Sequence, residues 1–115
     1  MDSIRIIDLE VFFRIGVPDE ERAKPQRLLI SIEMERDLYA AGETDDLKQT
    51  INYYDVVQRI LKLGENREWR LIEALAEEIA EIVLREFNAE AAIVEVKKFI
   101  IPQAQSVSVR IRRPT

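Results

Sequence analysis

Lys98 is the side chain best placed by the sequence to transfer a proton. Ala92, Val94 and Val96 precede it at every second position, as on the buried face of a strand. A lysine at the end of such a row either extends its charge to solvent or lies partly desolvated in a cleft. Desolvation would lower its pKa and make it a proton donor or acceptor near neutrality. Lys97, by contrast, lies on the polar row.

The other candidates are carboxylates and phenols. Glu73, near the start of a predicted helix, either complements the helix dipole or accepts two hydrogen bonds from a guanidine-like ligand edge. Tyr53 and Tyr54 begin another predicted helix, and we expect one in the core and the other facing solvent or ligand. Glu20 and Glu21 lie in a long polar loop, where a carboxylate is either simply solvated or functional.

The composition excludes several other chemistries. The chain has 115 residues, which predicts one domain over 1–115, and it contains neither Cys nor His. Thiolate nucleophiles, Ser-His pairs and the commonest metal ligands are therefore missing. The three glycines are scattered, so no glycine-rich phosphate loop exists. Asp45 and Asp46, an adjacent acidic pair, are better explained as helix-capping residues than as a metal site.

Charge and hydropathy indicate where the protein acts. The 17 Lys and Arg against 22 Asp and Glu give a net charge of −5, which argues against nucleic acid as a partner. Arg110, Arg112 and Arg113 are typical of a solvated strand edge. No apolar run approaches the roughly 20 residues of a membrane span, and no signal-peptide pattern is present. We therefore expect a cytoplasmic protein without a membrane partner.

Periodicity predicts the elements that must position these residues. Alternation indicates strands over 4–17 and 26–37, with the first strand's inward row formed by residues 7, 9, 11, 13 and 15. Helical spacing follows over 53–61 and 71–87, and alternation returns over 92–97 and 107–112. The order ββααββ predicts an α+β domain, with a four-stranded antiparallel sheet and both helices on one face.

The predicted sheet leaves a problem at its edges. Four strands give two unpaired edges, and residues of the opposite row, such as Ile4, Ile6 and Phe12, are also apolar. Natural proteins pair or cover such edges. Edge pairing between copies would solve the problem, so we expect a homo-oligomer.

Several segments, in order over nearly the whole chain, resemble the dihydroneopterin aldolase family. They are 15–22 (IGVPDEER), 25–26 (PQ), 41–47 (AGETDDL), 50–53 (TINY), 71–77 (LIEALAE) and 106–109 (SVSV). The resemblance implies the tunnelling fold, in which ββααββ units join their sheets into a four-membered ring that closes a barrel. Two rings commonly stack as an octamer.

The resemblance also implies a reaction. The family cleaves the side chain of 7,8-dihydroneopterin by a retro-aldol step, giving 6-hydroxymethyl-7,8-dihydropterin and glycolaldehyde for folate biosynthesis. The C=N bond of the pterin accepts the electrons, so no metal, Schiff base or other cofactor is implied. Only proton transfers remain for the protein, which suits a chain without His or Cys.

The resemblance assigns roles to individual residues. Lys98 matches the catalytic lysine, which acts with an ordered water. Tyr53 matches a tyrosine that assists proton transfer from a neighbouring subunit, and Glu21 matches a loop glutamate near the lysine. Glu73 matches the carboxylate that anchors the pterin, with help from backbone groups of Ile72 and Ile51.

Departures from the family pattern at two places keep alternatives open. Ile15 stands where most members have His, and the segment 99–105 is short and lacks Gly and His. An alignment shift there would make Lys97 the catalytic lysine instead of Lys98. These features, with residues 65–67, are similar to dihydroneopterin triphosphate 2′-epimerase, whose first steps are shared. A third alternative is a pterin- or purine-binding oligomer without catalysis.

Overall fold

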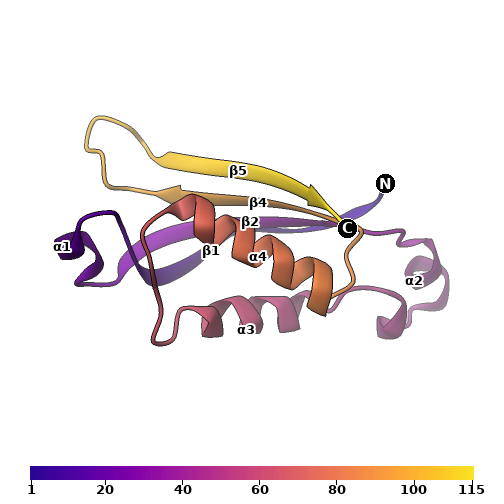
Figure 1. Ribbon diagram of the computed structural model, residues 1–115. Helices are drawn as coiled ribbons and strands as arrows, with labels where there is room; N and C mark the ends of the chain where they lie inside the picture. The colour runs from indigo at the N-terminus through magenta and orange to yellow at the C-terminus, as the bar shows by residue number, and fades with distance from the viewer.

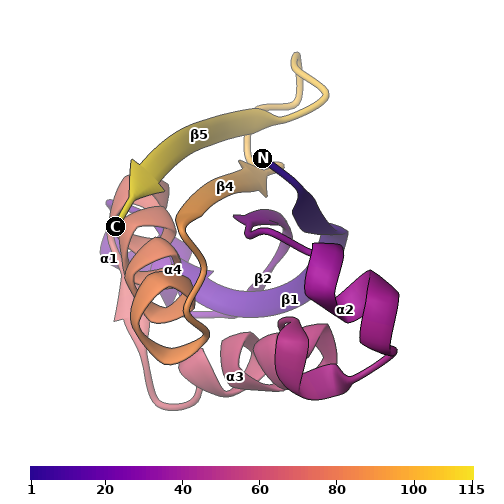
Figure 2. The ribbon, with the colours of Figure 1, turned by 90° about the vertical axis from the view of Figure 1, so that its right-hand side faces the viewer.

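The computed structural model describes residues 1–115 as a curled sheet with its long helices along one face (Figures 1 and 2). The elements, in chain order, are β1 (Ser3–Ile15), α1 (Asp19–Arg22), β2 (Gln26–Glu35), α2 (Tyr39–Thr44), the 3-10 helix η1 (Leu47–Gln49), α3 (Tyr53–Leu63), β3 (Glu68–Trp69), α4 (Ile72–Glu86), β4 (Ala91–Lys98) and β5 (Val107–Pro114). The strand order is β3-β1-β2-β4-β5. Only β3 pairs in parallel, with the end of β1.

The predicted ββααββ order is confirmed for the four long strands and the two long helices. The α+β class is confirmed as well, but the sheet has a fifth strand, β3, and the chain has two further short α-helices and one 3-10 helix. α1 lies inside the segment predicted as a loop. Elements of two to six residues complete too few turns or alternations to leave a periodic signal.

A β-bulge overturns the predicted inward row at the start of β1. Ile6 pairs with Ile32 but Leu9 pairs with Ile30, so β1 contains one extra residue. Asp8 adopts a positive φ of 56° there, and its N–H donates to Ser31 Oγ at 2.9 Å. One extra residue exchanges the two faces of a strand. Ile6 therefore packs against the core, whereas Ile7, predicted to face inward, is 64% exposed.

One hydrophobic core lies between the sheet and α3 and α4. β2 contributes Leu28, Ile30, Ile32 and Met34, and α4 contributes an inward row of its own. In α3 the buried residues are Val56, Ile60 and Leu63. The expectation that one of two tyrosines joins this core is wrong, because Tyr53 and Tyr54 are 62% and 65% exposed. They lie at the start of α3, before its apolar stripe begins.

The sheet keeps two largely unpaired edges. β5 has no partner strand beyond it, and β3 covers only Arg14 and Ile15 of the thirteen residues of β1. Ile7 and Phe12 of β1 expose large apolar side chains. No helix combines the length and the apolar composition that a membrane span requires.

Candidate active site

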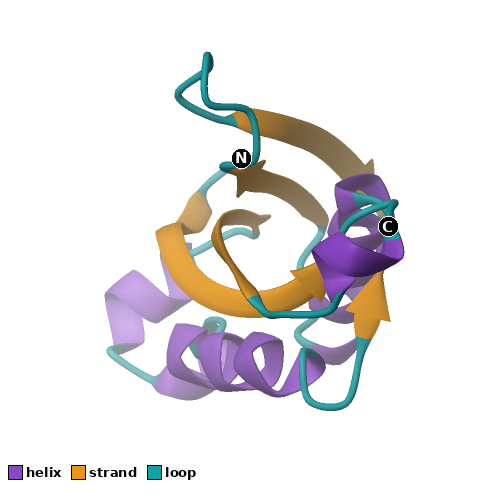
Figure 3. Cartoon of the chain, turned by 90° about the vertical axis from the view of Figure 1, so that its left-hand side faces the viewer, coloured by secondary structure: helices purple, strands orange, loops and turns teal.

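Glu21 and Lys98 form an ion pair at one end of the sheet. Lys98 Nζ lies 3.0 Å from Glu21 Oε2, and each side chain is only 16% exposed. Lys98 is the last residue of β4, and Glu21 lies in α1, which follows β1 at the same end of the molecule (Figure 1), the end that faces the viewer in Figure 3. The sequence prediction that Lys98 continues a buried row is confirmed, since Val94 and Val96 are fully buried.

Gln26 holds the Glu21 carboxylate from the other side. Gln26 Nε2 donates to Glu21 Oε2 at 2.9 Å and to the carbonyl oxygen of Ile15 at 2.7 Å. Burial raises the pKa of Glu21, but the hydrogen bonds from Gln26 and Lys98 and the charge of Lys98 together outweigh it. The pKa of Glu21 therefore lies below its ordinary value of 4.5, and its carboxyl group is ionised at neutral pH.

Gly16 leaves the space that the Glu21 carboxylate occupies. A Cβ on Gly16 would lie 2.3 Å from Glu21 Cδ and 2.4 Å from its Oε1, far inside contact distance. Gly16 also has a φ of 145°, a conformation that residues with a side chain rarely adopt. Glycine is therefore required at this position for the backbone and for the carboxylate.

Glu73 and Ile72 begin α4, near the end of β1 that leads to Gly16. The N–H of Gly16 donates to the carbonyl of Trp69 at 3.0 Å, and α4 starts three residues after Trp69. Ile72 is buried, and Glu73 is exposed in the first turn. No side chain caps this helix, so its first N–H groups stay free for a ligand. A carboxylate beside free N–H groups can bind an edge that carries both donors and acceptors.

Tyr53 and Ile51 lie at the opposite end of the molecule from Lys98 and Glu21. Residues 50–54 line a cavity together with Ile4, near the start of β1, whereas Gly16 follows its end. β1 has 13 residues, so these ends are roughly 40 Å apart along the strand. α1 and α2 mark the two ends in Figure 1. The structure therefore does not bring Tyr53 to Lys98 within one chain.

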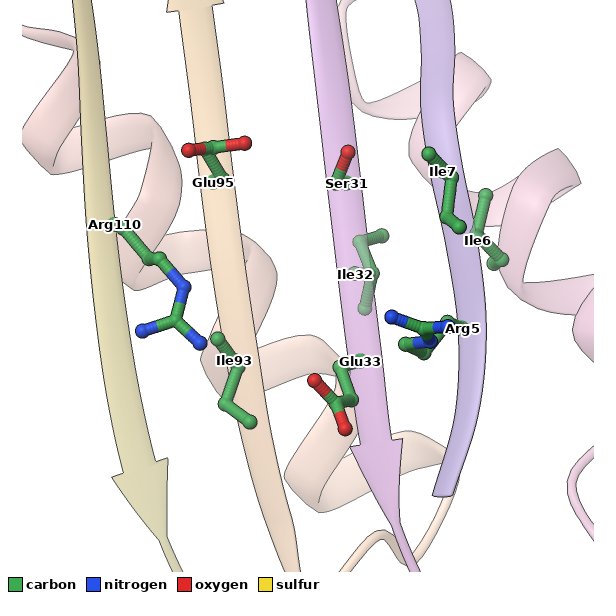
Figure 4. Close-up of a pocket in the computed structure, with 9 residues that line it drawn as sticks. All are labelled: Arg5, Ile6, Ile7, Ser31, Ile32, Glu33, Ile93, Glu95 and Arg110. Atoms are coloured by element: carbon green, nitrogen blue, oxygen red, sulfur yellow. The ribbon is translucent and has the colours of Figure 1, made fainter.

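Lys97 faces the other side of the sheet from Lys98. Its Nζ lies 3.5 Å from Asp8 and 3.9 Å from Glu95, away from Glu21. On that side a groove, which lies on the sheet face opposite the helices, is lined by residues of β1, β2, β4 and β5 (Figure 4). The groove contains Arg5, Glu95 and Arg110 but none of the predicted site residues.

Sequence reasoning missed two residues of this region, Gln26, which bonds Glu21, and Arg22, which follows Glu21 in α1. Gln26 is a polar residue at the end of the buried row of Leu28 and Ile30. A polar residue that ends a buried row is also the pattern that identified Lys98. Arg22 is buried, with 9% exposure, and contacts the backbone of Gly16 and Val17. The sequence does not indicate that Arg22 is buried, because an arginine in a polar segment is expected to be exposed.

Comparison with known proteins finds relatives of this chain in sequence and in structure. The family model described as dihydroneopterin aldolase (FolB) matches residues 4–112. Dihydroneopterin aldolase of Methylorubrum extorquens is 39% identical over 114 residues, covering 99% of this chain and 77% of that protein. The structure of the Escherichia coli aldolase in complex with neopterin has a TM-score of 0.93 and 32% identity, covering 98% and 99% of the two chains.

The sister activity appears among the relatives too. Dihydroneopterin triphosphate 2′-epimerase of Pseudomonas aeruginosa is 30% identical, covering 96% of this chain and 91% of that one. The Methylorubrum extorquens aldolase is more similar to this chain than the epimerase is, at 39% against 30% identity. The chain belongs to the dihydroneopterin aldolase family, and its fold is the tunnelling fold of that family.

Proposed function

We propose that this protein cleaves 7,8-dihydroneopterin by a retro-aldol reaction. The observation that carries the proposal is the partly desolvated Lys98–Glu21 pair, in a chain of this family. A proton leaves the side-chain hydroxyl, the adjacent carbon–carbon bond breaks, and glycolaldehyde departs. The bond electrons enter the C=N bond of the pterin as an enamine. Protonation of the enamine carbon then gives 6-hydroxymethyl-7,8-dihydropterin.

Lys98 is proposed as the group that exchanges protons with the substrate, through an ordered water. Its ammonium is partly desolvated and held in one orientation by Glu21, which suits repeated proton transfer. Glu21 keeps its charge at neutral pH and is proposed to bind the side-chain hydroxyls. Because Lys98 is the residue against Glu21, we assign the catalytic role to it and not to Lys97.

Glu73 is proposed to anchor the pterin. Its carboxylate would accept two hydrogen bonds from the guanidine edge of the pterin, and the free N–H groups beginning at Ile72 would meet the adjacent carbonyl oxygen. The Escherichia coli relative binds neopterin in its crystal structure, which supports a pterin as the ligand of this site.

A second copy of the chain is proposed to complete the site with Tyr53 and the backbone of Ile51. Tyr53 is exposed and lies at the opposite end of the molecule from Lys98. A second copy of the chain is therefore needed to bring a tyrosine at this position next to Lys98. The unpaired outer edges of β1 and β5 offer the surface for such contacts. Joined edges would give a ring of four chains, and two rings an octamer.

The test is incubation of the purified protein with 7,8-dihydroneopterin and, separately, with its triphosphate. We expect equal amounts of 6-hydroxymethyl-7,8-dihydropterin and glycolaldehyde from the first substrate. Turnover of the triphosphate to its 2′-epimer, with no glycolaldehyde from dihydroneopterin, would instead assign the epimerase activity of the Pseudomonas aeruginosa relative. Binding without turnover of either substrate would leave a pterin-binding protein.

A further inference from the structure

Arg22 is a buried charged residue that the proposed mechanism does not use. Its side chain is 10% exposed, and it is the one charged residue among the 26 buried residues. A buried charge is costly unless it is paired and hydrogen-bonded. Hydrogen bonds and ion pairs of the Arg22 guanidinium compensate this cost, and they connect two separate segments of the chain.

The guanidinium of Arg22 contacts the loop and a separate strand. Nη1 donates to the carbonyl oxygens of Gly16 and Val17, both at 2.8 Å, and Nη2 pairs with Asp19. Nε reaches Glu68 Oε1 of β3 at 3.2 Å. Arg22 therefore closes the loop that carries Glu21 and ties it to β3.

β3 is fixed in turn to α4. Trp69 Nε1 donates to Glu78 Oε1 of α4 at 3.1 Å, and the Trp69 ring stacks on Phe13 at 5.6 Å between centroids. Glu78 also receives two hydrogen bonds from Arg67, each at 2.9 Å. Arg22 thus joins the loop to Glu68 of β3, and the next residue of β3, Trp69, joins that strand to Glu78 in the second turn of α4.

We propose that Arg22 is a positioning residue that holds Glu21 against Lys98 and fixes this pair relative to the start of α4. The inference rests on the proposed function, in which Glu73 binds the pterin and Lys98 acts on its side chain. The planar fork of an arginine reaches two carbonyls and two carboxylates at once, which the compact ammonium of a lysine cannot do. Geometry at a reacting centre matters on this scale, because a 1 Å displacement costs roughly 100-fold in rate.

The kinetic test compares Arg22→Lys with Glu68→Gln and with a control, Arg59→Lys. Arg59 forms a similar two-bond pair with Glu86, between α3 and α4, away from Glu21. We expect Arg22→Lys to lower kcat for dihydroneopterin at least about tenfold, with KM and the Kd for neopterin within about threefold. Glu68→Gln also lowers kcat, but by a smaller factor than Arg22→Lys, because the Glu68 carboxylate is exposed. The control Arg59→Lys leaves kcat unchanged. An unchanged kcat in Arg22→Lys and in Glu68→Gln would overturn the proposal.

A measurement that needs no turnover separates this proposal from the proposed function. The Glu21 carboxyl is titrated by ¹³C NMR in glutamate-labelled protein, with its signal assigned by its loss in Glu21→Gln. We expect the pKa of Glu21 to rise in Arg22→Lys, because the loosened loop lets Glu21 leave Lys98 and Gln26. An unchanged pKa of Glu21 would contradict the positioning role. Inactivity of the wild type towards dihydroneopterin would refute only the proposed function.

Discussion

Lys98 Nζ and Glu21 Oε2 lie 3.0 Å apart, although 77 positions separate the two residues in sequence. β4 brings the lysine and the loop after β1 brings the glutamate, because both end at the same end of the sheet. Gln26, at the start of β2, fixes the carboxylate from a third strand. The pair is held by three elements and is therefore arranged before any substrate binds.

Gly16→Ala should separate this pair. The new Cβ would occupy the place of the Glu21 carboxylate, and the φ of 145° would be strained. We expect kcat for dihydroneopterin to fall at least about tenfold and the free energy of unfolding to fall by about 1–3 kcal/mol. Gly42→Ala is the control, because no atom lies within 4 Å of a Cβ there and alanine favours a helix. An active Gly16→Ala enzyme would show that the position of Glu21 is unimportant.

Acid should remove a contribution of Glu21 to stability. The folded-state pKa of Glu21 lies below its ordinary value of 4.5, so its stabilisation is complete above pH 4.5 and is lost as pH falls through the folded-state value. The difference in thermal midpoint between wild type and Glu21→Gln, at one protein concentration, should therefore shrink on going from about pH 7 to about pH 3. Lys98→Met removes the partner and should reduce this pH dependence. A difference that stays constant across this range would contradict the ionic pair.

Glu73→Gln should weaken binding of the pterin. Loss of a charged partner to two hydrogen bonds costs about 2–4 kcal/mol, or roughly 30- to 1,000-fold in Kd. The Kd of neopterin, measured by titration calorimetry, reports the change. Glu81→Gln, on the same helix but exposed and paired with Arg85, should leave this Kd unchanged. Equal binding by wild type and Glu73→Gln would remove Glu73 from the pterin site.

Two inactive variants should restore activity when they are produced together. Lys98→Ala chains keep Tyr53, and Tyr53→Ala chains keep Lys98, so a mixed assembly contains sites with both residues intact. Random mixing of equal amounts predicts about a quarter of wild-type activity if each site takes the two residues from different chains. Activity that stays at the level of the separate variants would show that one chain supplies both residues.

Alternation of apolar residues was sufficient to predict the main sheet and the position of Lys98. A row of period two identifies one face of a strand. Because Val94 and Val96 are buried on that face, Lys98 was predicted to lie on the same face. The same reasoning failed at Ile7, because the bulge at Asp8 depends on one residue with positive φ and leaves no mark in the apolar pattern. Gln26 was within reach of this reasoning, since it extends a buried row of β2.

The contacts of the site were beyond periodicity. The meeting of Glu21 with Lys98 depends on α1, a helix of four residues, and on the buried Arg22 at its end. A loop conformation set by one guanidinium and two carbonyl oxygens has no period. The roles of Glu21, Glu73 and Tyr53 came from family resemblance. The structure adds that Tyr53 lies near the start of β1, whereas Glu21 and Glu73 lie near its end.

The comparison of Lys98→Ala with Lys97→Ala tests the central claim most directly. Lys98 lies against Glu21, whereas Lys97 faces Asp8 on the other side of the sheet. Release of glycolaldehyde from 7,8-dihydroneopterin and the Kd of neopterin are measured for both variants and the wild type. We predict that Lys98→Ala loses turnover with neopterin binding largely kept, and that Lys97→Ala retains both. Full turnover by Lys98→Ala, or its loss in Lys97→Ala alone, would contradict the account.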